Sequence, residues 1–176
     1  MNVGIVFGCF IPLHQGHLNI IERALRENDK VIIGICGYAE DRGNDFLPFA
    51  ERQRLMQNRF GNNEKVILSV VDDRKIGLTG KFDEEAWRIW SKEFFTNAKI
   101  DSQDDQYNFT WYTGDKRYVD TLYTVFPKHS FFLQARGELS GTLIRQDYKK
   151  HKDLIDDYFY TYLEERAKGT QNSIDF

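Results

Sequence analysis

The sequence predicts an α/β protein with a Rossmann-like, doubly wound parallel sheet of five strands and a C-terminal helical extension. Short apolar runs alternate with segments of helical periodicity along the chain, which is typical of parallel α/β folds. The runs are apolar at nearly every position, as expected for strands that helices cover on both faces. The first run, a helical pattern and a second run follow one another within about thirty-five residues, which predicts a right-handed βαβ unit.

Five apolar segments are predicted to form the strands. The first two cover residues 3–7 and 31–36, and an amphipathic helix over residues 18–27 lies between them. The third covers residues 66–71 and is followed by Asp72 and Asp73. The fourth, over residues 109–113, ends at Gly114 and Asp115, and the fifth covers residues 130–133.

The remaining helices lie between and after these strands. Pro48 suits the first turn of a helix that runs to about residue 59 and is closed by Gly61. A helix over residues 83–98 carries Trp87 and Trp90 at helical spacing. Further helices are predicted over residues 116–125, 140–148 and 153–167, and residues 168–176 are expected to be a frayed tail.

Length and composition limit the class of protein. With 176 residues, the chain suits one domain over residues 1–150, on which a helix and tail of residues 151–176 pack. A net charge of −3 argues against nucleic acid or an anionic membrane as a partner held by bulk charge. The chain shows neither a signal peptide nor an apolar run of membrane-spanning length, so we expect a cytoplasmic protein. The aromatic last helix suits either core or a subunit interface, which leaves a homo-oligomer open.

The strongest functional signal is the segment from Gly8 to His17, which reads G-C-F-I-P-L-H-Q-G-H. It lies where the first strand becomes a helix, and a helix N-terminus favours anions. His14 and His17 add two imidazole donors, while Gly16 lets a nucleotide approach the backbone. Zinc is the rival ligand for paired histidines, but the other two histidines lie far along the chain. We therefore predict a phosphate site.

A second segment, R-G-E-L-S-G-T-L-I-R from Arg136 to Arg145, predicts a capped helix with cationic and hydroxyl groups in its first turns. Taken alone it suits an ordinary cap with a solvated arginine. Paired with the first segment, it predicts a second anion-binding helix end. Ligands of doubly wound sheets bind at the carboxyl ends of the strands. Five residues follow predicted strands at that edge, namely Gly8, Arg42, Asp72, Gly114 and Arg136.

These two segments resemble the HxGH and ISxTxxR motifs of the nucleotidylyltransferase superfamily. The similarity extends to the NadR-type nicotinamide-mononucleotide adenylyltransferases, which share the segment from Phe7 to His14 in outline. Those proteins also carry an acidic pair followed by glycine, here Asp72, Asp73 and Gly77, and a W-x-x-W helix. The resemblance covers residues 1 to about 150, with the two end motifs as its most specific part.

The resemblance implies the reaction ATP + nicotinamide mononucleotide → NAD + pyrophosphate, without a covalent enzyme intermediate. His14 and His17 would hold the ATP phosphates and the charge that develops in the transition state, and Arg145 would join them as a catalytic residue. Mg²⁺ would bridge the phosphates without a dedicated protein ligand. The residues implied for ATP binding are Gly8, Phe10, His14, Gly16, His17, Gly114, Asp115, Arg136, Ser140, Thr142 and Arg145.

For the acceptor, the resemblance implies that Trp87 stacks on the cationic nicotinamide ring, with Trp90 in reserve. Tryptophans on one helix face are equally typical of a core. Asp72 would orient the amide or ribose, although it also suits a strand-end cap. Arg42 is the substitute for a phosphate-binding lysine that many superfamily members carry after the second strand. The residues implied for acceptor binding are Phe7, Cys9, Phe10, Arg42, Asp72, Trp87 and Trp90.

Three alternatives stay open at this point. The same chemistry suits phosphopantetheine as the acceptor, or a cytidylyltransferase that acts on a polyol phosphate. From a different class, a module that senses NAD or another nucleotide would bind without turnover. Two cysteines, Cys9 and Cys36, lie in apolar strand-like runs and are interpreted as reduced packing residues rather than as a disulfide.

Overall fold

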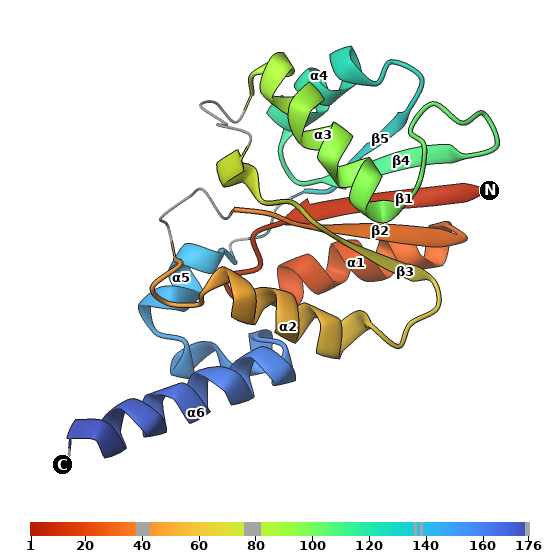
Figure 1. The fold of residues 1–176 in the computed structure, drawn as a ribbon. Helices are drawn as coiled ribbons and strands as arrows, with labels where there is room; N and C mark the ends of the chain where they lie inside the picture. Colours follow the sequence, from red (N-terminus) through yellow and green to blue (C-terminus); the bar gives the residue numbers. More distant parts are fainter. Residues whose placement is uncertain (38–42, 76–81, 136, 138, 175–176) are drawn as a thin grey trace.

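The protein is built around a five-stranded sheet in which every neighbouring pair of strands is parallel (Figure 1). The computed structural model describes residues 1–37, 43–75, 82–135, 137 and 139–174. The strand order is β3-β2-β1-β4-β5, so the chain winds outward in both directions from β1. This order confirms the predicted doubly wound fold. The strands are β1 (Asn2–Gly8), β2 (Lys30–Ile35), β3 (Val66–Val70), β4 (Asn108–Thr113) and β5 (Ser130–Leu133).

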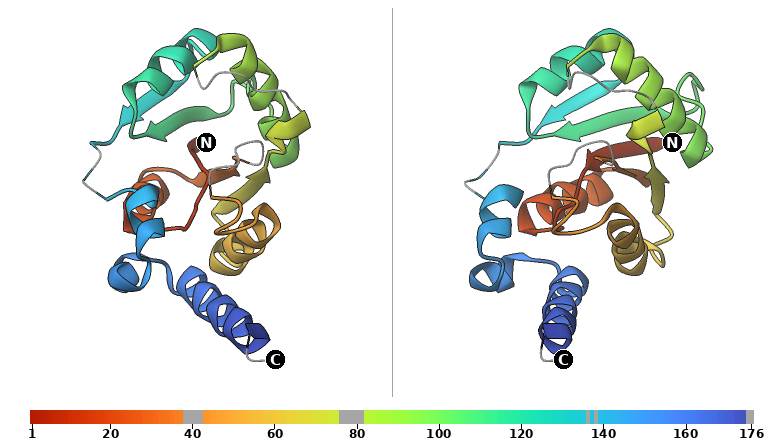
Figure 2. Two further views of the ribbon diagram at one scale, coloured as in Figure 1. Left: turned by 90° about the vertical axis from the view of Figure 1, so that its left-hand side faces the viewer. Right: turned by 60° about the vertical axis from the view of Figure 1, so that its left-hand side comes forward.

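Helices cover both faces of the sheet (Figures 1 and 2). One face carries α1 (Gln15–Glu27) and α2 (Phe49–Phe60), and the other carries α3 (Glu84–Ala98) and α4 (Lys116–Val125). The chain then continues through α5 (Gly141–Gln146) to α6 (Asp157–Ile174), which lies below α2 in Figure 1. Two short 3₁₀ helices, η1 (Asp73–Lys75) and η2 (Lys149–Leu154), were absent from the sequence prediction. Across the described residues, no helix combines the length and the apolar character needed to cross a membrane.

Two hydrophobic cores follow from this layering. On the α1 and α2 face, Val31, Ile33 and Ile35 from β2 pack against helix residues and against Phe159 of α6. On the α3 and α4 face the core is aromatic, with Trp111 of β4 fully buried among residues of both helices. Because strands β1 and β2 are covered on both sides, residues 3–6 of β1 and 31–35 of β2 are all buried.

The C-terminal part differs from the prediction of one helix over residues 153–167 followed by a frayed tail. Residues 149–154 form the 3₁₀ helix η2, Ile155 is extended, and α6 starts only at Asp157 and continues to Ile174. A tertiary contact explains the break, because Ile155 forms an isolated β-bridge with His14. In addition, the backbone N–H of Asp156 donates to the carbonyl of Leu13 at 3.0 Å. A residue paired in this way cannot continue a helix.

Candidate active site

The candidate site begins where β1 ends and the chain turns into α1. This turn contains a cis peptide bond between Ile11 and Pro12, and Phe10 adopts the left-handed conformation with φ of 54°. His14 ends the turn as the N-cap of α1, which therefore starts three residues earlier than predicted. The cap is a side-chain nitrogen rather than the usual hydroxyl or carboxylate oxygen.

His14 and His17 cap the helix reciprocally. The Nδ1 atom of His14 accepts a hydrogen bond from the backbone N–H of Gly16 at 3.1 Å. The backbone N–H of His14 in turn donates to Nδ1 of His17 at 3.3 Å. An imidazole nitrogen that accepts such a bond carries no proton, so each neutral ring holds its proton on Nε2. Each ring therefore presents an N–H donor on the edge that faces away from the helix backbone.

The charge state of His14 is set by its surroundings. Its side chain is 5% exposed, and burial, followed by the nearby positive charge of Arg145, lowers its pKa to about 4. His14 is consequently neutral at pH 7 and acts as a hydrogen-bond donor rather than as a cation. The two rings stack with their centroids 3.8 Å apart, which fixes the direction of both Nε2–H groups together.

Gly16 is required by the ring of His14. A methyl group built on Gly16 would lie 2.9 Å from Cε1 and 3.0 Å from Nδ1 of that imidazole. The sequence analysis assigned Gly16 to close approach of a nucleotide; the structure supplies a local packing reason for the same glycine. A larger residue would displace the ring that caps the helix.

The second motif meets the first one in space. Arg145 donates through Nη1 to the carbonyl of Ile11 at 2.8 Å and through Nη2 to the hydroxyl of Thr142 at 3.2 Å. Gly141 permits this arrangement, since a methyl group there would lie 3.0 Å from Nη1 of Arg145. Ser140 caps α5 as predicted, with its hydroxyl accepting from the N–H of Leu143. The two segments are therefore adjacent, although the contacting residues Ile11 and Arg145 lie 134 positions apart in the chain.

The residues expected to bind adenosine follow β4, the strand that pairs with β1 on the side away from β2. Gly114 follows β4, and Asp115 is the N-cap of α4. The carboxylate of Asp115 accepts from the backbone N–H of Arg117 at 2.9 Å and forms an ion pair with its guanidinium at 2.8 Å. Gly8 lies under the ring of Phe10, which a methyl group on Gly8 would approach to 3.2 Å.

Among the described residues expected to contact ligands, Phe10 and Trp90 are the most deeply buried. Phe10 is 1% exposed and packs in the core, so its ring is not presented to a ligand. Trp90 is 2% exposed and stacks on Phe94 with ring centroids 5.0 Å apart. Trp90 is therefore a core residue rather than a reserve stacking partner. Its helical spacing is the same in either role, and only the packing of α3 against the sheet decides between them.

Trp87 lies at the border of the same aromatic core. It is 8% exposed, and its ring contacts Phe7 at a centroid distance of 5.2 Å and Tyr118 at 5.6 Å. Phe7 is the second-last residue of β1 and comes directly before the segment from Gly8 to His17. The expected stacking of Trp87 on a ligand stays a prediction.

The other expected acceptor residues have the following places. Asp72 follows β3 and pairs with Arg74, whose Nη2 lies 3.1 Å from its carboxylate. Its neighbour Asp73 is buried and accepts from the N–H of Gly37 at 3.1 Å. Cys9 is half-buried in the histidine turn. Arg42 and Arg136 lie outside the described residues.

Sequence reasoning missed Arg52 of α2, whose side chain is fully buried. Its guanidinium donates to the carbonyls of Cys9 at 2.7 Å and Cys36 at 3.0 Å, and to the side-chain oxygen of Asn44 at 2.7 Å. It thereby joins the ends of β1 and β2. A signal was available, because Arg52 lies three residues after Phe49 and four before Met56 on the apolar face of α2.

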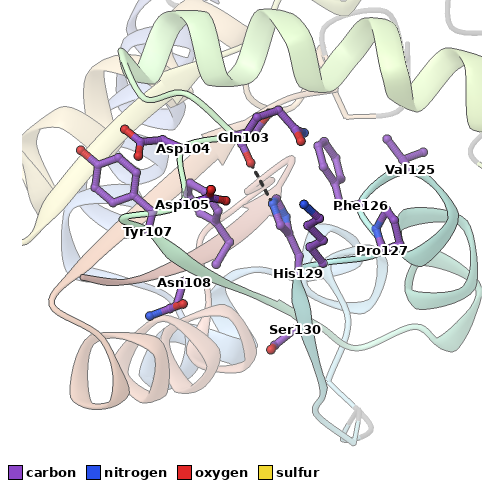
Figure 3. Close-up of a pocket in the computed structure, with 13 residues that line it drawn as sticks. Gln103, Asp104, Asp105, Tyr107, Asn108, Val125, Phe126, Pro127, His129 and Ser130 are labelled. Atoms are coloured by element: carbon purple, nitrogen blue, oxygen red, sulfur yellow. Dashed lines mark hydrogen bonds between the residues drawn. The ribbon is translucent and has the colours of Figure 1, made fainter.

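A cavity of about 280 Å³ lies at the opposite edge of the sheet (Figure 3). It is lined by Asn108 and Ser130, the first residues of β4 and β5, and by the buried face of His129. Nδ1 of His129 accepts from the indole N–H of Trp111 at 2.9 Å, and its Nε2 lies 3.1 Å from the carbonyl of Ser102. This histidine ties the 101–107 loop to the sheet. The cavity is separate from the histidine pair, which lies at the carboxyl ends of the strands.

The chain is similar to known proteins both in sequence and in fold. Residues 5–147 match the sequence model of a family described as cytidylyltransferase-like. A phosphopantetheine adenylyltransferase of Streptococcus pneumoniae (strain Hungary19A-6) is 36% identical over 149 residues, which cover 85% of this chain and 88% of the relative.

Two crystal structures of NadR protein, one in complex with NR and one with NAD and AMP-PNP, are similar in fold. They have TM-scores of 0.73 and 0.71, with 27% sequence identity each, and the similarity covers 90% of this chain. This chain spans a little under half of those proteins, 44% and 45% of their lengths.

Proposed function

The chain belongs to the cytidylyltransferase-like family and is a nucleotidyltransferase, and we propose that it transfers AMP from ATP to nicotinamide mononucleotide. The products are NAD and pyrophosphate. The observation that carries adenylyl transfer is the meeting of His14, His17 and Arg145 at the carboxyl ends of the strands.

The chemistry follows from the state of the acceptor. A phosphate monoester has its second pKa near 6 and is mostly a dianion at pH 7, so it needs no general base. One of its oxygens attacks the α-phosphorus of ATP, and the bond from that phosphorus to the bridging oxygen breaks. The electron pair leaves with pyrophosphate. Catalysis then requires positioning and stabilisation of charge rather than proton removal.

The residues of the site suit this requirement. The neutral rings of His14 and His17 offer Nε2–H donors to the phosphate oxygens on which charge develops. Arg145 keeps a permanent positive charge and would hold the departing phosphates together with Thr142. Both groups are held in place before substrate arrives, and such preorganisation is the main source of electrostatic stabilisation.

Nicotinamide mononucleotide is proposed as the acceptor on two grounds. The NadR structures, one of which contains NAD, are similar in fold over 90% of this chain. In addition, the half-buried rings of Phe7 and Tyr118 pack against Trp87 near the end of β1, and they leave aromatic surface that a cationic ring could contact.

Phosphopantetheine is the second candidate acceptor, favoured by the 36% identical relative that matches over 85% of the chain. It requires the same transfer step and the same histidine pair. The two candidates differ only in what occupies the acceptor side of the site.

Mg²⁺ is proposed to accompany ATP. The described carboxylates at this edge already have partners, since Asp72 pairs with Arg74 and Asp115 with Arg117. The ion would therefore be held through phosphate oxygens and water, where it would neutralise phosphate charge.

The test is pyrophosphate release from ATP and Mg²⁺ with each acceptor in turn, with the nucleotide product identified by mass spectrometry. NAD formed with nicotinamide mononucleotide, and no product with phosphopantetheine, is the expected result. The reverse pattern would overturn the choice of acceptor. Tight NAD binding without pyrophosphate release from either acceptor would instead identify a nucleotide-sensing module.

A further inference from the structure

The C-terminal part of the chain, which lies beyond the residues matched by the family model, contacts the candidate site. The family match ends at residue 147, whereas η2 and α6 cover residues 149–174. Two sets of contacts link this part to the active site, one at the start of α6 and one near its middle. Both reach residues that lie next to His14 or Arg145.

The first set holds the histidine turn. Ile155 pairs with His14, and Asp156 donates its N–H to the carbonyl of Leu13. The Asp156 carboxylate is buried and forms an ion pair with Arg59 of α2 at 2.8 Å, while its other oxygen accepts from the N–H of Tyr158. One residue therefore anchors the turn, α2 and α6 together.

The second set holds residues 43–47, which we call the 43–47 segment. The guanidinium of Arg166 on α6 donates to the carbonyls of Phe46 at 2.5 Å and Asp45 at 2.7 Å. From the other side, Arg52 donates to the side chain of Asn44 at 2.7 Å. The segment is further closed by a bond from the N–H of Leu47 to the carbonyl of Gly43.

The 43–47 segment touches the site directly. Gly43 has φ of 83°, and a methyl group built on it would lie 2.7 Å from Cγ2 of Ile11 and 3.5 Å from Cδ of Arg145. The segment therefore lies against the residue whose carbonyl binds Arg145 and against Arg145 itself. Arg145 is one of the residues expected to hold the ATP phosphates, so the 43–47 segment lies against the phosphate side of the proposed site.

We propose that Arg166 is a positioning residue for Arg145, acting through the 43–47 segment. This inference rests on the proposed function, because it presumes that Arg145 holds the phosphates of ATP. Arg166 is exposed, so its two bonds contribute little to folding stability. Their effect is to hold two consecutive carbonyls, and with them the backbone that lies against Arg145.

The experiment compares Arg166→Ala and Arg166→Lys with the wild-type protein and with Arg54→Ala. Arg54 is an exposed arginine of α2 that pairs with Glu51 and lies over the ring of Tyr162 on α6. The variant Arg54→Ala therefore removes the same charge at a site close to α6. Each variant is assayed for kcat and for KM of ATP and acceptor. Hydrogen exchange of a peptide covering the 43–47 segment reports on its backbone without any need for turnover.

For Arg166→Ala we expect faster exchange in the 43–47 segment and a KM of ATP raised by roughly 3- to 10-fold, with the KM of the acceptor unchanged. Arg166→Lys should recover part of the loss, because its ammonium reaches one carbonyl rather than two. Arg54→Ala should match wild type.

Unchanged exchange in Arg166→Ala would overturn the inference, whatever its activity. Complete recovery by Arg166→Lys would overturn it too, because charge alone would then explain the effect. A change in the KM of the acceptor alone would exclude a role through Arg145. Wild-type protein inactive with both acceptors would overturn the proposed function and the role of Arg166 with it, while a normal wild type with a normal Arg166→Ala would overturn this inference alone.

Discussion

The imidazole rings of His14 and His17 are stacked 3.8 Å apart, and each occupies its Nδ1 atom with a backbone N–H. The Nδ1 atoms complete the first turn of α1. In the proposed function the Nε2–H groups of the same rings would contact the substrate. Helix capping and the proposed stabilisation of the transition state would then depend on the same two rings, and the variants below separate them.

Removing the Nε2–H donor of His17 should lower turnover strongly without unfolding the protein. His17→Ala is expected to lower turnover by roughly 10²–10⁴-fold, the usual cost of one transition-state donor. His17→Asn keeps a side-chain oxygen close to the position of Nδ1, so it preserves the cap while it lacks the Nε2–H. It should melt near the wild-type temperature and still lose turnover. Wild-type turnover in His17→Asn would remove His17 from the mechanism.

Stability should fall between pH 6.5 and 4 because of His14. Burial lowers the pKa of His14 to about 4, whereas the unfolded chain binds its proton near 6.5. Between these values the unfolded state holds more protons, so stability rises with pH through this window and is lost as pH falls through it. The shift amounts to at most roughly 3 kcal/mol.

Urea unfolding at pH 7 and pH 4.5 measures this loss. The control is His14→Asn, whose side-chain oxygen can accept from the N–H of Gly16 but does not titrate in this range. His129, whose pKa burial also lowers, contributes to both proteins and cancels in the difference. An equal loss of stability in wild type and His14→Asn would show that His14 is not responsible.

Gly16→Ala should destabilise the protein even though alanine favours helices. Propensity alone predicts a gain of about 1 kcal/mol for this change inside a helix. The added methyl group would, however, lie 2.9 Å from Cε1 of His14 and displace the ring. We expect a lower melting temperature together with a loss of turnover of about 10- to 100-fold.

The matched control for that change is Gly169→Ala on α6, where an added methyl group meets nothing within 4 Å. Gly169→Ala should leave turnover unchanged and raise stability slightly. If Gly16→Ala behaved in the same way, the packing reason for Gly16 would be wrong.

The two tryptophans of α3 should respond differently to truncation. Trp90→Ala opens a cavity in the aromatic core and should cost about 3–5 kcal/mol of unfolding free energy. Trp87→Phe keeps an aromatic ring at the border of the core and should raise the acceptor KM more than it lowers kcat. Urea unfolding and steady-state kinetics provide the two readouts. A change in the KM of ATP alone in Trp87→Phe would contradict its assignment to the acceptor.

The sequence analysis succeeded where the determining interactions are local. Asp83 and Ser140 were predicted as helix starts and are N-caps, because a cap depends only on the next two or three residues. It failed for the C-terminal helix, where the pairing of Ile155 with His14 interrupts a pattern that looks helical. That pairing joins segments about 140 residues apart, and no local pattern contains it.

By itself, the sequence determined the order of strands and helices, the doubly wound sheet and the two motif segments for which phosphate binding is proposed. These follow from periodicity, caps and motif spacing, all of which act over short distances along the chain. Only the tertiary structure decided that Trp90 belongs to the core, that both histidines hold their protons on Nε2, and that Arg52 joins the ends of β1 and β2. Each of these depends on which groups from distant segments lie within hydrogen-bond or packing distance, and that is set by the packing of helices on the sheet.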